Sequence, residues 1–133
     1  MNLSSEKFLV CFYGLAACSW VPHWACHYYR LETRSTFIVG KWRFSPAHSS
    51  VSLLVYSFLI AINLMAIGSA EYRVLSAMIS GVGHLSIGLL HVYRLWRPFH
   101  FEVFGHEWSR NASLREAAIV VPFGLLCLVV AAA

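Results

Sequence analysis

Hydrophobic residues form four long runs along this chain, and polar residues are concentrated between them. The runs cover about 8–28, 51–70, 75–95 and 116–133. About 20 mainly apolar residues are needed for a helix to cross the hydrocarbon core of a bilayer. The pattern therefore predicts an all-α fold, a polytopic transmembrane helical bundle with four spans. Because these spans and their connections use the whole chain, residues 1–133 are expected to form a single integral membrane domain.

Composition supports this prediction and excludes a soluble domain. Hydrophobic residues make up 59% of the chain, charged residues 12%, and the mean hydropathy is +0.63, whereas about a quarter of the residues in a soluble domain are charged. The net charge of +4 does not indicate a nucleic-acid partner, because the basic residues stand singly near the ends of the apolar runs. The expected environment is the lipid bilayer.

The connections between the runs carry weaker signals. Residues 29–50 alternate in hydrophobicity around Gly40, which predicts a short hairpin or an interfacial segment. Pro46 stands where a helix can start. The short turn at 71–73 makes spans two and three an antiparallel hairpin. Residues 93–116 mix aromatic and basic side chains, as is typical of a segment on the membrane surface.

The distribution of basic residues predicts the topology. The first and third connections hold eight Lys and Arg residues, whereas the N-terminus and the second connection hold only Lys7 and Arg73. Cytoplasmic loops carry the excess of Lys and Arg. We therefore expect a multi-pass protein of a cytoplasmic (inner) type of membrane, with both long loops in the cytoplasm and both termini outside.

Histidines inside the apolar runs are the main chemical signal. In the third run, Gly81, His84, Gly88 and His91 lie on one helical stripe because they are spaced by three or four residues. An ionisable residue in a membrane needs a partner, and glycines let another group approach closely. The sequence therefore predicts a polar, histidine-bearing seam that involves the third span.

The first run carries a second pair, His23 and His27, one helical turn apart. With both termini outside, spans one and three run in the same direction. Counting about 1.5 Å per residue from the middle of each span places His23, His27 and His91 at similar depths. Histidines from two spans could thus hold one ligand between them.

One hypothesis is a b-type haem held by His84 or His91 from one span and His23 or His27 from the other. Arg94 and Arg97, at the cytoplasmic edge, would meet the propionates. The segment from His84 to His91 resembles the haem-bearing helix of the succinate dehydrogenase cytochrome b subunit, which has the pattern His-x3-Gly-x2-His. The resemblance covers eight residues, with Leu90 in place of an arginine, and implies haem b as cofactor.

Other hypotheses use the same side chains. A metal site at His23, His27, His84 and His91 is one, because His23-x3-His27 resembles a histidine box of membrane hydroxylases and desaturases. A metal-ion or proton transporter with a relay of histidines and Asn63 is another. In the simplest interpretation the histidines are packing groups, Asn63 bonds to a neighbouring helix, and the four cysteines are structural thiols.

The sequence offers no Ser, His and acid combination for nucleophilic catalysis, so an enzyme acting alone is not expected. The leading prediction is a small accessory or anchor subunit of a larger membrane complex, with other membrane subunits as partners. Haem-linked electron transfer is the alternative, and small-ion transport the third.

Overall fold

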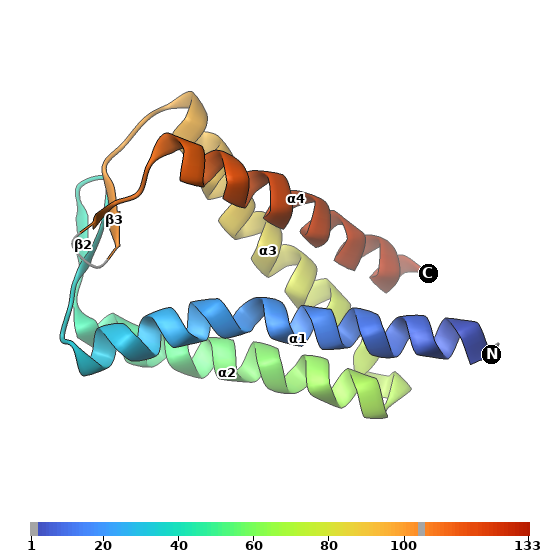
Figure 1. The fold of residues 1–133 in the computed structure, drawn as a ribbon. Coiled ribbons are helices and arrows are strands. Elements are labelled where there is room, and N and C mark those ends of the chain that lie inside the picture. The colour runs from blue at the N-terminus through green and yellow to red at the C-terminus, as the bar shows by residue number, and fades with distance from the viewer. Residues whose placement is uncertain (1–2, 104–105) are drawn as a thin grey trace.

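A computed structural model describes residues 3–103 and 106–133 as four long helices and one small sheet (Figure 1). The elements are α1 (Leu3–Glu32), β1 (Phe37–Val39), β2 (Trp42–Phe44), α2 (Pro46–Gly68), the 3-10 turn η1 (Ala70–Tyr72), α3 (Arg73–Trp96), β3 (Phe101–Val103), β4 (His106–Glu107) and α4 (Arg110–Ala132). All four α-helices are long and apolar enough to cross a membrane. The four apolar helices expected from the sequence are therefore confirmed in their length and composition.

The helices extend beyond the apolar runs that predicted them. Helix α2 begins at Pro46, as expected, but α4 begins at Arg110 instead of residue 116. Ser109 caps α4, since its hydroxyl accepts a hydrogen bond from the Ala112 N–H at 3.1 Å. The first turn of this helix is polar, so hydrophobicity alone places the start too late. Helix α1 continues through Pro22 without a break.

The expectation of an all-α fold is corrected by a four-stranded antiparallel sheet in the order β2-β1-β3-β4. The predicted hairpin around Gly40 is confirmed as β1 and β2, with Val39 opposite Trp42. The second hairpin, which we expected to be a surface segment, pairs with the first, with Ile38 opposite Glu102. This pairing joins loops that are far apart in the sequence, so no local pattern reveals it.

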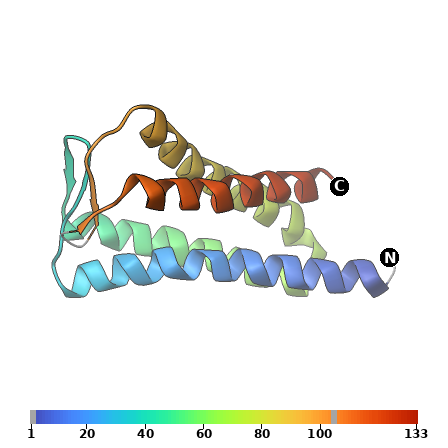
Figure 2. The same cartoon turned by 45° about the horizontal axis from the view of Figure 1, so that its top comes forward.

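The helices pack as two pairs, α1 with α2 and α3 with α4. Figure 1 shows the pairs close together near the chain termini and diverging toward the sheet. The buried apolar cluster near the termini draws on all four helices, with Phe12, Tyr13, Ala66, Ala77 and Cys127. Figure 2 shows the sheet, which the two long loops form, at the end of the molecule opposite the chain termini.

Asn63 joins α2 to α3 within the buried interior. Its side-chain N–H donates to Ser80 Oγ at 2.8 Å, and Ser76 Oγ donates to its carbonyl oxygen at 2.9 Å. All three side chains are fully buried. The predicted bond between Asn63 and a neighbouring helix is therefore confirmed.

Replacing Asn63 with leucine is expected to lower the stability of the bundle by about 1 kcal/mol, because both serines lose a buried partner. The measurement is the midpoint of thermal unfolding in mild detergent. The matched control is Asn111→Leu, since Asn111 is exposed in the first turn of α4. Equal midpoints for the two variants would show that the Asn63 bonds add nothing to stability.

Candidate functional site

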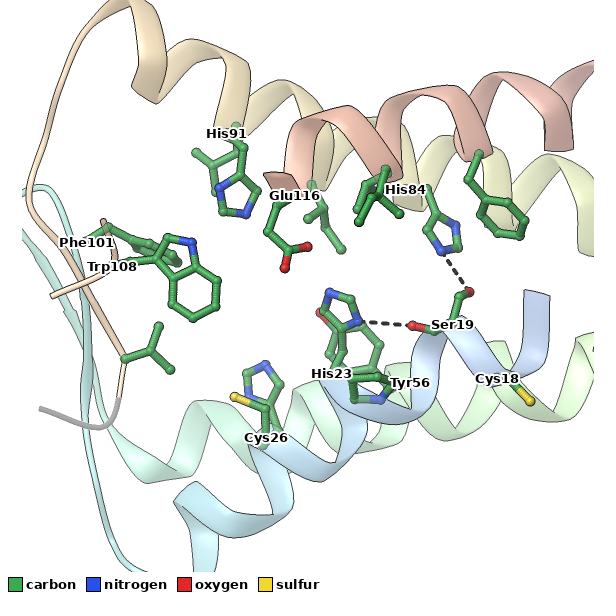
Figure 3. Close-up of a pocket in the computed structure, with 18 of the residues that line it drawn as sticks. Cys18, Ser19, His23, Cys26, Tyr56, His84, His91, Phe101, Trp108 and Glu116 are labelled. Atoms are coloured by element: carbon green, nitrogen blue, oxygen red, sulfur yellow. Dashed lines mark hydrogen bonds between the residues drawn. The ribbon is translucent and has the colours of Figure 1, made fainter. Parts of the chain in front are cut away.

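A cavity of about 1010 Å³ lies between the two diverging helix pairs (Figure 3). Sites for small molecules and cofactors span roughly 300–1,000 Å³, so the cavity can hold a large ligand. Residues of α1, α3 and α4 form its walls, Tyr56 contributes from α2, and the sheet closes one end. The lining is mainly apolar, with a small number of polar groups.

The sheet presents one face to this cavity. Phe37 and Val39 of β1 line it, as do Phe101 and Val103 of β3. Alternate residues of a strand point to the same side. The two strands therefore turn matching apolar positions inward, and the pairing between the loops builds the end wall of the site.

All four candidate histidines line the cavity, His23 and His27 from α1 and His84 and His91 from α3. Each is held through Nδ1 by an oxygen atom. The partners of Nδ1 are Ser19 O for His23 (3.3 Å), Ser49 Oγ for His27 (3.3 Å), Ser80 O for His84 (2.7 Å) and Ser113 Oγ for His91 (3.2 Å). Such a partner on one ring nitrogen is typical of histidines that bind a metal through the other.

The partners also assign the tautomers of three of these rings. A backbone carbonyl only accepts, so Nδ1 carries the proton in His23 and His84, and Nε2 keeps its lone pair. In His27 the assignment is reversed, because Nδ1 accepts a hydrogen bond from Arg30 Nη1 at 3.2 Å. His27 therefore presents an N–H at Nε2 and is not ready to bind a metal there.

His84 differs from the others in having both ring nitrogens engaged. Its Nε2 lies 2.9 Å from Ser19 Oγ, and its ring centroid is 3.9 Å from that of Trp20 and 4.9 Å from that of Phe123. Among the described residues, Nε2 of His23 and His91 has no hydrogen-bond partner. The arrangement leaves His23 on α1 and His91 on α3 as the two rings free to bind a ligand.

His91 can carry its proton on Nδ1 and keep the lone pair of Nε2, because the partner of Nδ1 is a hydroxyl, which can accept a hydrogen bond. Ser113 Oγ accepts from Arg94 Nη1 at 2.6 Å and retains a second lone pair, with which it can accept the Nδ1 proton of His91. The Glu116 carboxylate interacts electrostatically with both His23 and His91. Figure 3 shows it between the two rings, so the three side chains share one neighbourhood.

The glycines beside the histidines do not provide the space that the sequence suggested. A Cβ on Gly88 would lie 2.5 Å from Val121 Cγ2, and one on Gly81 would lie 2.7 Å from Leu128 Cδ2. Both neighbours belong to α4. These glycines allow α3 and α4 to pack closely, and the open space lies on the side of α3 that faces α1.

The two candidate arginines of the third loop lie outside the cavity lining. Arg94 is buried and fastens the loop to α3, donating to Phe99 O (3.1 Å), Ser109 O (3.1 Å), Ser113 Oγ and Trp108 O. Arg97 is exposed, with its guanidinium 5.1 Å from the Trp96 ring centroid. Neither is placed to meet a ligand in the cavity.

Arg30, Glu116 and Tyr56 are among the lining residues that the sequence did not predict. Arg30 follows His23 and His27 on the same helical face, at spacings of seven and three residues, and this spacing could have identified it. Glu116, the lone acid among the described lining residues, stands at the start of the fourth apolar run. Tyr56 lies with its ring centroid 5.5 Å from those of His23 and His27, and no pattern marked it.

A preassembled metal-ion centre is not present in residues 3–103 and 106–133. There, no group of three or more His, Cys, Asp or Glu side chains comes together as such a site. The candidate ligands His23, His27, His84 and His91 are spread along the cavity instead. Comparison with known protein families, with characterised proteins and with solved structures found no match, so the class of the protein rests on its fold and its site.

Proposed function

We propose that this protein is a multi-pass membrane protein that binds a b-type haem in the cavity and serves in electron transfer. The iron ligands would be His23 of α1 and His91 of α3. One observation carries the proposal. These two rings border the same large, mainly apolar cavity from two helices, each held at Nδ1, with Nε2 lacking a hydrogen-bond partner in the described residues.

The residues around the cavity fit such a group. The macrocycle needs apolar walls, which the inward faces of β1 and β3 and the side chains of α4 supply. His23 and His91 would hold the haem through their Nε2 atoms, and the haem would supply one-electron redox chemistry. The protein's contribution is to hold the two imidazoles in place and to keep bulk water away from them.

The orientation in the membrane is part of the proposal. Both long loops lie at the sheet end, since their strands pair, and eight of the ten Lys and Arg residues lie in these loops or in the adjoining turns of the helices. Because cytoplasmic loops carry the excess of basic residues, we propose that this end lies in the cytoplasm of an inner-type membrane, with both termini outside. A reporter that is active only in the cytoplasm is expected to be inactive when fused to the C-terminus.

Electron transfer requires a donor and an acceptor, so the proposal includes partner proteins. We propose that the chain acts as a small accessory or anchor subunit of a larger membrane complex. Apolar side chains such as Leu54, Val82 and Val129 are more than half exposed on the helices and lie outside the cavity lining, and they would face lipid or a neighbouring subunit.

The test is the absorption spectrum of the protein purified in mild detergent after expression with added haem precursor. The expected result is a Soret band that sharpens on reduction with dithionite and a split visible band, as a six-coordinate haem gives. Titration of haem into protein purified without it should saturate at one haem per chain. A colourless protein that also takes up no haem in the titration contradicts the proposal.

A further inference from the structure

Arg30 is a fully buried cation at the sheet end of the cavity. Its side chain is only 1% exposed and lines the cavity wall. Among the described residues, no carboxylate lies within ion-pairing distance of its guanidinium, since the ion pairs there involve Arg73 and His100. Burying a charge without a counter-charge is strongly unfavourable, so this site is one where an anion would be stabilised.

The guanidinium of Arg30 also has unused hydrogen-bond donors. Of its five N–H groups, one donates to Phe44 O at 3.2 Å and another to His27 Nδ1 at 3.2 Å. Its Nε is buried with no partner in the described residues. These two bonds hold the guanidinium in place and leave three of its five N–H groups without a partner in the described residues.

The other arginines that are largely buried lack this feature. Arg73 forms a two-point ion pair with Glu6, with N···O distances of 2.9 and 3.3 Å, and its Nε donates to Ala66 O. Arg94 uses all three guanidinium nitrogens, which donate to backbone carbonyls of the loop and to Ser113 Oγ of α4. Arg30 is thus the buried arginine whose charge and donors the described protein leaves unmatched.

The surroundings of Arg30 indicate what kind of anion fits. The Phe37 ring centroid lies 4.2 Å from the guanidinium carbon, which fixes the plane of the group. Elsewhere in the cavity wall, the indole N–H of Trp108 is a second buried donor that has no partner in the described residues. Arg30 is the lone arginine or lysine among the described lining residues, and Glu116 adds a negative charge. The single planar guanidinium of Arg30 suits a singly charged carboxylate, whereas a phosphate dianion needs more hydrogen-bond donors and more positive charge.

We propose that the Arg30 end of the cavity is an acid site, which binds the carboxylate of an amphipathic molecule whose apolar body fills the cavity. Two molecules could supply this carboxylate, namely haem, through a propionate, and a long-chain fatty acid from the bilayer. Where the source is haem, this inference rests on the proposed function. In this proposal Arg30 binds the carboxylate, in place of Arg94 and Arg97, which the sequence suggested as its partners.

The first test changes the ligand and leaves the protein intact. Binding of haem b to the purified protein is compared with binding of its dimethyl ester, by absorbance titration. Binding of hexadecanoic acid is compared with that of hexadecanol, by the fluorescence change of Trp108 and the other tryptophans. We expect the acid of a pair to bind about tenfold or more tightly than its uncharged counterpart.

The second test changes the protein. In Arg30→Gln the preference for the acid is expected to disappear, and in Arg30→Lys, which keeps the charge but not the planar fork, it is expected to be partly retained. The control is Arg43→Gln, which removes the same charge from an exposed position of β2 outside the cavity. The helical circular dichroism of each variant shows whether it is folded.

The outcomes separate this inference from the proposed function. Equal binding of acid and uncharged counterpart by the intact protein, in both pairs, overturns the acid site, whatever the variants do. If both pairs bind equally but haem colours the protein as expected, haem binding stands and the acid site is wrong. If only hexadecanoic acid is preferred and haem does not bind, the acid site stands and haem is not its occupant.

Discussion

Alanine in place of His91 is expected to abolish the six-coordinate haem spectrum and to weaken haem binding by about 100-fold or more. Loss of a partner outside the ligand shell already costs about 10–100-fold in metal affinity, and His91 is proposed as a ligand itself. The same loss is expected for His23→Ala. The measurement is a haem titration followed by spectra of the oxidised and reduced protein.

His84→Ala provides the discriminating comparison. The likeness to a haem-bearing helix makes His84 and His91 equivalent candidates, but the structure engages both nitrogens of His84 with Ser19 and Ser80. We expect His84→Ala to keep the six-coordinate spectrum and to lower stability, because buried partners lose their hydrogen bond. His100→Ala, at an exposed position, is the neutral control. Loss of the spectrum in His84→Ala with retention in His91→Ala would reverse the ligand assignment.

The second large effect is expected for Gly124→Ala, at the contact between α3 and α4. A Cβ there would lie 2.9 Å from Leu85 Cγ, 3.0 Å from the Leu85 nitrogen and 3.1 Å from Gly81 O. Two of these atoms belong to the backbone of α3, so the helices must separate to make room. Overpacking of this kind typically costs about 1–3 kcal/mol, seen as a lower midpoint of thermal unfolding in detergent.

Gly14→Ala is the matched control for this substitution. Gly14 lies within α1, and a Cβ there would meet no atom within 4 Å. The same chemical change is therefore expected to leave the midpoint unchanged or to raise it slightly, since alanine favours the helix over glycine. A midpoint for Gly124→Ala that matches that of Gly14→Ala would mean that the helix pair tolerates the added methyl group.

The site was only partly predictable from the sequence. Histidines in apolar runs are costly, and this physical rule alone identified His23, His27, His84 and His91, all of which line the cavity. Arg30 was identifiable by its helical spacing from His27, but Tyr56 was not, because its contribution depends on how α2 packs against α1. Arg94 and Arg97 were assigned as partners of the propionates because they stand at the end of the third span. In the structure the third loop folds back onto Arg94, whose guanidinium bonds to that loop.

The sequence by itself determined the four apolar helices, and it indicated a hairpin or an interfacial segment around Gly40 and a cross-helix bond as the simplest role of Asn63. Each follows from local rules, namely the length of an apolar run, alternation about a turn, and the cost of an unpaired buried amide. Only the tertiary structure decided that the two loops join in one sheet, that Gly81 and Gly88 face α4, and which histidine nitrogens remain free. These features depend on contacts between segments far apart in the chain, where the geometry of packing, and not local composition, selects the partner of each group.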